Sequence, residues 1–213
     1  MANRIKVLGI NIDPLTMRET VDAVERYVLG KRALHLMGVN ADKINQCHTD
    51  EKIKKIVNDS GIINADGASV VLASKFLGTP VPERVAGIDL MQSLLELSNN
   101  KGYSVYFFGA KEEVLQDMLK AFKNDYPNLI VVGNRNGYFS ADDEQDIQED
   151  IREKNPDFVF VGITSPKKEY IIQKFMDNGV NSVFMGVGGS FDVLSGHIQR
   201  APLWMQKSNL EWL

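Results

Sequence analysis

The chain has 213 residues, of which 44% are hydrophobic and 24% charged, as in ordinary globular proteins. This length allows one large domain or two small ones with an ample core. The formal net charge of −4 gives no support for general nucleic-acid binding. A single cysteine, Cys47, excludes an internal disulfide framework and a zinc–cysteine cluster, so a reducing, cytoplasmic setting fits best.

The N-terminus lacks the long apolar core and the cleavage site of a secretory signal. No run of the sequence approaches the roughly 20 apolar residues that a bilayer-spanning helix needs. We therefore expect a protein that is soluble or, at most, attached to a membrane surface.

The N-terminal part predicts short strands that alternate with helices. Thr16 and Glu19 have the spacing of a capping box, which marks a helix start, and Gly30 marks its end. The predicted segments are a strand or hairpin at Ile5–Ile12, the helix from Thr16 to Gly30, a strand at Ala33–Val39, helical segments around Ile44 and Ile53–Val57, a short strand at Ile62-Ile63 and a helical segment at Val70–Phe76.

The alternation becomes regular in the second half. The predicted segments are a helix at Ile88–Leu97, a strand at Ser104–Phe108, a helix to about Tyr126, a strand at Leu129–Val132, a helix at Ser140–Lys154, a strand at Phe158–Val161, a helix at Pro166–Asp177 and a strand at Ser182–Met185. Unbroken apolar strands of this kind are typical of parallel strands buried on both faces. We predict a doubly wound, Rossmann-like α/β fold, a mostly parallel sheet with helices on both faces, in one domain over residues 1–199.

Asp66 stands where a predicted strand ends, and Asn40 stands at the end of another. Ligands of α/β proteins gather outside the carboxyl ends of the strands, so both residues are candidates for a polar site. The turn that follows the Val70–Phe76 segment adds Arg84. The alternative for Asp66 is that it caps the next helix; the two roles are compatible, because a helix N-terminus favours an ionised carboxylate.

Three strand-to-loop junctions are rich in glycine or other small residues: Gly109-Ala110, Gly162-Ile163 and Gly186–Ser190. Such turns let backbone N–H groups approach phosphate oxygens. The last one, GVGGSFD, resembles a dinucleotide fingerprint but has Phe191 where the third glycine is needed. The alternative is that these glycines only permit tight packing of strands and helices.

Other polar and aromatic residues are weaker candidates. Tyr138 and Phe139 could offer an aromatic face to a nucleobase, with a core role as the alternative. Asp192 could bond a ribose hydroxyl or cap a helix. The sequence has no D-x-D triplet, no G-x-x-x-x-G-K-[ST] phosphate loop and no G-x-S-x-G elbow. Its three histidines lack metal-ligand spacing, with His197 the least certain because it lies near Arg200, so no metal site is predicted.

The tail, residues 200–213, predicts the start of an amphipathic helix at Pro202. The chain stops on Trp212-Leu213 without a cap, a glycine or a basic last turn. We expect this segment to be the beginning of a truncated C-terminal appendage whose remainder would cover an apolar surface, such as a membrane interface.

Seven motifs occur in order over essentially the whole chain: VNAD at 39–42, NADG at 64–67, PERV at 82–85, GYF at 137–139, SPKKE at 165–169, GVGGSFD at 186–192 and RAP…LEWL at 200–213. Together they resemble the WecG/TagA/CpsF glycosyltransferases. The resemblance implies the small α/β fold called GT-E and an inverting, metal-independent transfer. It also implies a cytoplasmic enzyme at the inner face of the bacterial membrane that moves N-acetylmannosamine from UDP to N-acetylglucosamine on undecaprenyl diphosphate, in wall teichoic acid synthesis.

The resemblance assigns roles residue by residue. Asp66 aligns with the catalytic base, Arg84 with an arginine that acts on the diphosphate region, and Asn40 with an active-site asparagine. Lys168 stands where the family has glutamine, and Gly38 where some members have threonine, which leaves the sugar and the acceptor open. The residues expected to bind substrate are Gly109, Ala110, Tyr138, Lys168, Gly186, Gly188, Gly189 and Asp192.

The implied partners are a UDP-sugar donor, a polyprenyl-diphosphate-linked acceptor sugar and a membrane surface met by the rest of the appendage. No cofactor, metal or nucleic acid is expected, and the apolar tail could drive self-association of this chain. Three alternatives stay open. They are another UDP-hexose donor in capsule or exopolysaccharide synthesis, a non-catalytic nucleotide-binding regulatory module, and an NAD-dependent oxidoreductase, which would lack the third glycine and a clear ribose-binding acid.

Overall fold

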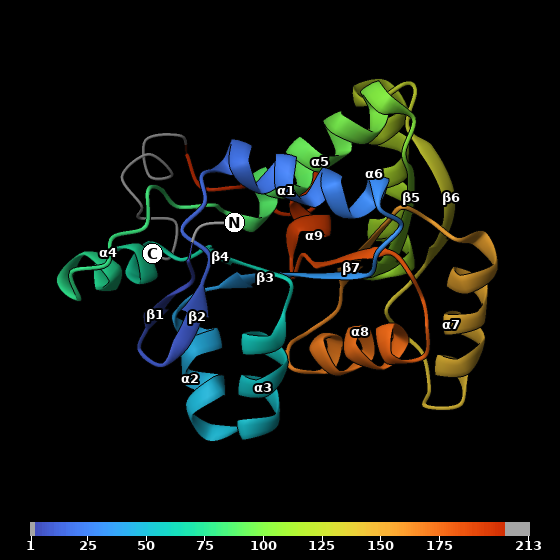
Figure 1. Ribbon diagram of the computed structural model, residues 1–213. Coiled ribbons are helices and arrows are strands. Elements are labelled where there is room, and N and C mark those ends of the chain that lie inside the picture. Colours follow the sequence, from blue (N-terminus) through green and yellow to red (C-terminus); the bar gives the residue numbers. More distant parts are fainter. Residues whose placement is uncertain (1–2, 203–213) are drawn as a thin grey trace.

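A computed structural model describes residues 3–202 of the chain, so the helix expected in the tail lies outside the described part. The centre is a six-stranded sheet with the order β4-β3-β8-β7-β5-β6 (Figure 1), and every neighbouring pair in it is parallel. Its strands are β3 (Leu34–Val39), β4 (Ile62–Ala65), β5 (Ser104–Gly109), β6 (Ile130–Arg135), β7 (Phe158–Gly162) and β8 (Val183–Gly186). A separate antiparallel hairpin consists of β1 (Ile5–Val7) and β2 (Ile10–Ile12). The predicted α/β fold is thereby confirmed.

Helices cover both faces of the sheet (Figure 1). On one face lie α1 (Met17–Leu29), α5 (Gly87–Lys101), α6 (Glu112–Asp125) and the short α9 (Ser190–Leu194). On the other face lie α2 (Ala41–Thr49), α3 (Glu51–Asp59), α7 (Asp143–Lys154) and α8 (Lys167–Asp177). The remaining helix, α4 (Ala68–Phe76), extends beyond the β4 edge of the sheet. Among residues 3–202, no helix is both long enough and apolar enough to cross a membrane.

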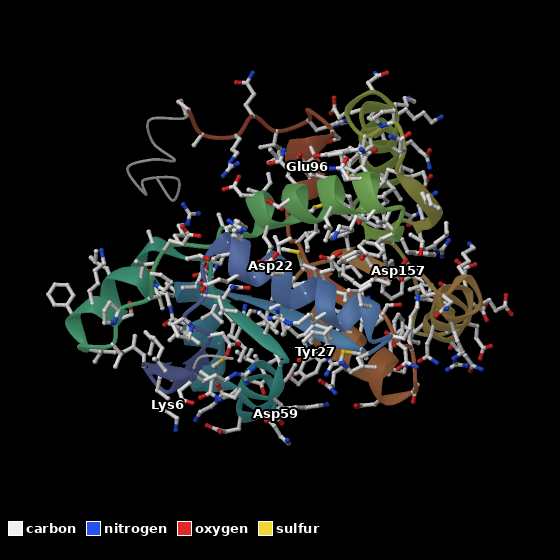
Figure 2. The ribbon with its side chains drawn as sticks, turned by 45° about the horizontal axis from the view of Figure 1, so that its top comes forward. Lys6, Asp22, Tyr27, Asp59, Glu96 and Asp157 are labelled. Carbon is white, nitrogen blue, oxygen red and sulfur yellow. The ribbon has the colours of Figure 1, made fainter. Side chains whose placement is uncertain are left out.

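The helices turn apolar stripes toward the sheet and polar side chains outward; Asp22 on α1 and Glu96 on α5 are exposed examples (Figure 2). Successive side chains of β5 pack into hydrophobic clusters on opposite faces of the sheet, because side chains alternate across a strand. Phe107 packs with Phe160 on one face at 5.7 Å between ring centroids, whereas Phe108 packs with Phe139 on the other at 5.2 Å. Burial on both faces explains why β5 and β7 are apolar over most of their length.

Local signals in the sequence set the helix ends. Thr16 and Glu19 form the predicted capping box, and Gly30 is the C-cap of α1. Asp50 ends α2 and caps α3, its carboxylate accepting the N–H groups of Lys52 and Ile53.

The strand order decides which loops meet. Since β3 lies between β4 and β8, the residues that follow these three strands meet at one edge of the sheet. This order brings Asn40, Asp66 and the turn after Gly186 together.

Candidate functional site

A cleft of about 490 Å³ opens at the carboxyl ends of β4, β3 and β8. The start of α5 and the loop before α8 contribute its walls. The polar and glycine residues that line it include Gly38, Asn40, Lys43, Asp66, Arg84, Gly87, Ser165, Lys168, Glu169, Gly186, Gly188, Gly189 and Arg200. Seven of the predicted site residues therefore share one cavity: Asn40, Asp66, Arg84, Lys168, Gly186, Gly188 and Gly189.

Asp66 is half-buried and held by hydrogen bonds to the backbone of neighbouring elements. Its own N–H donates to the carbonyl of Val39 at 3.0 Å, and its Oδ1 accepts the N–H of Gly87 at 2.9 Å. Gly87 is the first residue of α5, so the carboxylate sits at the N-terminus of that helix, which favours the ionised form. The alternative role predicted for Asp66, the N-cap of the next helix, is not observed, because the N-cap of α4 is Gly67.

Glycines let the ends of β3 and β4 approach each other. A Cβ at Gly38 would lie 3.3 Å from the Cβ of Asp66, and a Cβ at Gly67 would lie 2.9 Å from the Cα of Asn40. Asn40 is exposed, and its side chain accepts the N–H of Lys43, capping α2. Arg84 reaches the same corner, where its Nε donates to the backbone oxygen of Asp66 at 2.6 Å.

A buried polar network forms another part of the wall. Lys43 Nζ lies 2.7 Å from Glu169 Oε1, and both side chains are nearly inaccessible to solvent. Ser165 Oγ lies 2.9 Å from the other oxygen of Glu169. Burial by itself would raise the pKa of Glu169, but the ammonium groups of Lys168 and Lys43 outweigh it and hold the pKa below its usual value.

Lys43 was not among the residues predicted from the sequence, since lysines on amphipathic helices are mostly exposed. One signal could have identified it. Lys43 precedes Cys47 by four residues, so it shares the buried side of α2 with that thiol. Burial raises the pKa of Cys47, in keeping with its predicted packing role.

Lys168 is a largely buried cation whose side chain is 15% exposed at the cleft. Burial lowers the pKa of its ammonium, while Glu169, at 3.7 Å, opposes that shift. A Cβ at Gly186 would lie only 2.8 Å from Lys168 Cε, so glycine at this position leaves room for the lysine. Glu169 makes its shorter ion pair with Lys43, at 2.7 Å, so the Lys168 ammonium is able to bind an anion in the cleft.

His35 lies beneath the cleft on β3 and is fully buried. Burial lowers its pKa from 6.5 to about 4, so the ring is neutral at physiological pH. Its Nδ1 has no hydrogen-bond partner among the described residues.

The Gly186–Gly189 turn is open on its outer side. No described atom lies within 4 Å of a Cβ placed at Gly188 or Gly189, and Gly188 has a φ of +52°. Phe191, which breaks the fingerprint, is fully buried and packs edge-on against Phe107. A Cβ at Gly162 would lie 2.7 Å from the Phe191 ring. The absence of a side chain at Gly162 therefore leaves room for that ring.

Four predicted binding residues lie outside the lining that the described residues define: Gly109, Ala110, Tyr138 and Asp192. Gly109 has a φ of +143°, and a Cβ there would lie 2.4 Å from the carbonyl carbon of Gly162. Ala110 donates its N–H to Gly162 O at 3.0 Å. Tyr138 is 67% exposed, whereas its neighbour Phe139 packs against the core. In the structure, Gly109 and Ala110 pack against and bond to the backbone of Gly162. A binding role for the four residues stays a prediction.

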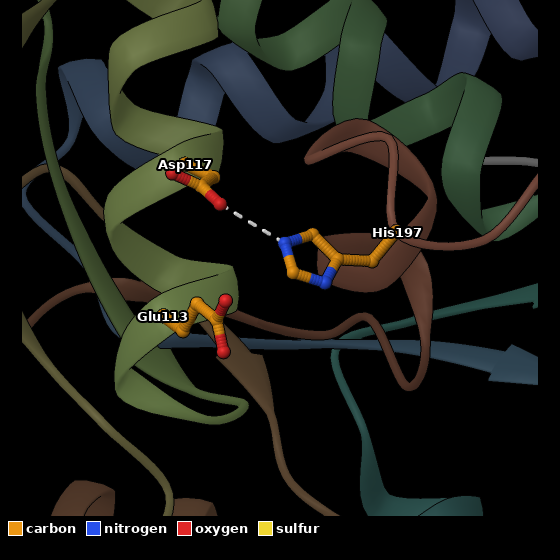
Figure 3. A group of neighbouring side chains, drawn as sticks. All are labelled: Glu113, Asp117 and His197. Carbon is orange, nitrogen blue, oxygen red and sulfur yellow. Dashed lines mark hydrogen bonds and ion pairs between the residues drawn. The ribbon is translucent and has the colours of Figure 1, made fainter.

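A second cluster of titratable groups joins α6 to the loop after α9 (Figure 3). His197 Nε2 lies 3.0 Å from Asp117 Oδ2, and Glu113 lies one turn earlier on α6, so that the three side chains could hold a metal ion. Hydrogen bonds from His197 and Lys120 hold the pKa of Asp117 below its usual value. The bond from His197 ties the loop after α9 to α6.

Farther along the chain, Arg200 forms a bidentate ion pair with Asp89 of α5, at 2.5 and 3.0 Å.

Comparison with known proteins identifies the family of the chain. Residues 5–213 match the sequence model of the glycosyl transferase WecG/TagA/CpsF family. An N-acetylglucosaminyldiphosphoundecaprenol N-acetyl-β-D-mannosaminyltransferase of Bacillus spizizenii is 35% identical over 162 residues, which span 76% of this chain and 62% of the relative. A protein of the same name from Staphylococcus aureus is 32% identical over 212 residues, 99% of this chain and 83% of that protein. The chain therefore belongs to the WecG/TagA/CpsF family of glycosyl transferases.

Proposed function

We propose that this protein is an inverting glycosyltransferase that moves N-acetylmannosamine from a UDP-sugar to N-acetylglucosamine on undecaprenyl diphosphate, at the inner face of the cell membrane, in synthesis of a cell-wall polymer. The observation that carries the proposal is that Asp66 and the Gly186–Gly189 turn line one cleft. The names of the relatives support the two sugars and the lipid diphosphate of the acceptor.

The proposed reaction is a single displacement. Asp66 accepts the proton of an acceptor hydroxyl, and the hydroxyl oxygen attacks the anomeric carbon of the donor. The bond from that carbon to the diphosphate breaks, and its electron pair leaves with UDP. The Gly87 N–H and the N-terminus of α5 support the base by keeping the carboxylate ionised until the proton transfers.

The leaving diphosphate gains negative charge, which must be stabilised. The cleft offers Arg84, Lys168 and the backbone N–H groups of the Gly186–Gly189 turn for this task. We propose that these groups act without a metal ion. The test is turnover in the presence of EDTA, and a loss of turnover that added divalent cation restores would overturn this part.

Replacing Asp66 tests the base directly. We expect Asp66→Asn to lower kcat by roughly 10²–10⁴-fold, because the amide cannot accept the proton. Release of UDP is measured with a soluble, short-chain lipid-diphosphate acceptor, and calorimetry and thermal unfolding check that UDP affinity and stability are kept. Asp22→Asn, at an exposed position of α1, removes one carboxylate outside the cleft and is the matched control. Unchanged turnover in Asp66→Asn would remove Asp66 from its role.

A further inference from the structure

Helix α4 and the residue that caps its C-terminus expose an apolar ridge, defined here as Leu72, Phe76 and Leu77. Phe76 is 87% exposed, Leu72 58% and Leu77 51%. Leu72 and Phe76 are four residues apart, so they lie on one side of the helix, while Val70 and Ser74 are buried on another. In the rest of the described chain, no helix exposes more than one large apolar side chain. An exposed apolar patch of this kind marks a surface that meets something else.

The α4 ridge lies close to the proposed catalytic base. The helix begins at Ala68, two residues after Asp66, and extends from the β4 edge of the sheet (Figure 1). Its nine residues span about 13 Å. The ridge is therefore about one helix length from Asp66, a distance that a sugar-diphosphate head group can bridge.

The charges around the ridge suit an anionic surface. From Gly67 to Pro82 the chain has one charged residue, the exposed Lys75, although the net charge of the whole protein is −4. Lys6, on the strand β1 that packs against α4, also projects into solvent (Figure 2). Positive charge beside exposed apolar side chains favours contact with the anionic head groups of a bilayer.

A second copy of the chain fits the ridge less well than a bilayer does. A stable protein–protein interface buries about 800 Å² on each partner, contributed by roughly 20–30 residues. Three side chains on one short helix and its C-cap fall well below that size. A bilayer needs no matching partner surface, because a few inserted side chains and adjacent positive charge suffice for reversible binding.

We propose that the α4 ridge inserts into the interfacial layer of an anionic bilayer and holds Asp66 at the level of the acceptor sugar. The position of the lipid-linked acceptor rests on the proposed function; the insertion itself does not.

Vesicle flotation tests the insertion. Wild-type protein should float with vesicles of equal parts phosphatidylglycerol and phosphatidylcholine. The Leu72→Ser/Phe76→Ser double variant should lose at least about tenfold in partition coefficient, because two large apolar side chains leave the interface. Leu29→Ser, which removes a 68% exposed leucine at the end of α1, is the matched control and should bind like the wild type. Absence of wild-type binding, or equal binding by the double variant, would overturn the proposal.

A fluorescent label locates the contact. Phe76→Cys can be labelled with an environment-sensitive dye, because Cys47 is buried and is the only other cysteine that this variant would contain. Vesicles should shift the emission of this label to the blue and leave a label on a Leu29→Cys variant unchanged. Light scattering of the unlabelled proteins identifies the rival occupant. A wild-type dimer that the double variant converts to a monomer would assign the ridge to a second copy and overturn membrane docking.

Activity separates this proposal from the proposed function. The double variant should keep wild-type turnover with a water-soluble acceptor and lose rate only with acceptor embedded in vesicles. A wild-type protein that transfers no sugar to either acceptor would contradict the proposed function, while flotation and the label would still decide the α4 ridge. Equal rates of wild type and double variant on vesicles would contradict the docking role.

Discussion

At the scale of single residues, Lys168 is the clearest case of a charged group held ready for an anion. Replacing it by glutamine keeps much of the length of the side chain and removes the charge. We expect Lys168→Gln to weaken UDP binding at least about tenfold, since a charge-assisted hydrogen bond is lost. Titration calorimetry measures the affinity. The exposed Lys167 lies outside the cleft lining, so Lys167→Gln is a matched control that changes the same charge.

The pH dependence gives the same prediction a second readout. Because burial lowers the pKa of Lys168, its ammonium is lost at lower pH than that of a solvated lysine. UDP affinity of the wild type should therefore fall as the pH rises through that lowered value, and the affinity of Lys168→Gln should follow this decline less steeply. Asp66, Glu169 and Lys43 are the charged groups that act on Lys168. Parallel pH profiles for the two proteins would contradict the assignment.

His35 makes a prediction about stability. Its pKa is about 4 in the folded protein, against 6.5 for a solvated histidine, so the unfolded chain binds more protons between these pH values. Stability from this group is complete above pH 6.5 and is lost as the pH falls toward 4. The expected loss at about pH 5 is about 2 kcal/mol.

Urea unfolding at neutral and mildly acidic pH measures this loss. In His35→Leu the free energy of unfolding should fall less between the two conditions than in the wild type, because the buried site then carries no group that must be protonated. His48→Gln, at an exposed histidine of α2, controls for the loss of an imidazole. An equal decline in wild type and His35→Leu would contradict the prediction.

At the scale of elements, the junction of β5 and β7 depends on Gly109. An alanine there would place its Cβ 2.4 Å from the backbone of Gly162 and would have to adopt a φ of +143°. We expect Gly109→Ala to lower the free energy of unfolding by about 3 kcal/mol or more. Gly189→Ala is the control, because its φ is −78° and no described atom lies within 4 Å of the new Cβ. The stability of that control should stay within about 0.5 kcal/mol of the wild type. Equal stabilities of the two variants, from urea unfolding, would contradict the packing role.

Elements were more predictable from the sequence than the contacts between them. Strands such as β5 and β7 were predicted because strands buried on both faces are apolar runs, whereas the edge strand β6 is largely exposed and only its first, apolar residues were predicted. The order of the strands was not predicted, and that order places β3 between β4 and β8. The capping box of α1 is a short-range pattern, whereas the bond from Gly87 to Asp66 joins residues 21 positions apart. No local pattern predicts such a contact, or the buried pairing of Lys43 with Glu169 across 126 positions.

At the scale of the whole molecule, the cleft joins the two halves of the chain. Asn40 and Asp66 follow strands of the first half, and Lys168 and the Gly186–Gly189 turn belong to the second. A ligand that contacts both halves binds the folded protein and not the unfolded chain, so it must raise stability by mass action. At about a hundred times its dissociation constant, UDP should add about 2.7 kcal/mol.

For a chain of this size that gain corresponds to a rise in Tm of roughly 5–10 °C, which a thermal scan detects readily. Of UDP and NAD, only UDP should produce it. Phe191 stands where the fingerprint has its third glycine, which in a dinucleotide site permits close packing of the helix on the strand, and its ring fills that space in the core. The rise should shrink in Lys168→Gln and persist in Lys167→Gln. A shift with NAD and none with UDP would favour the oxidoreductase alternative, since the same glycine turn would then be serving a different diphosphate.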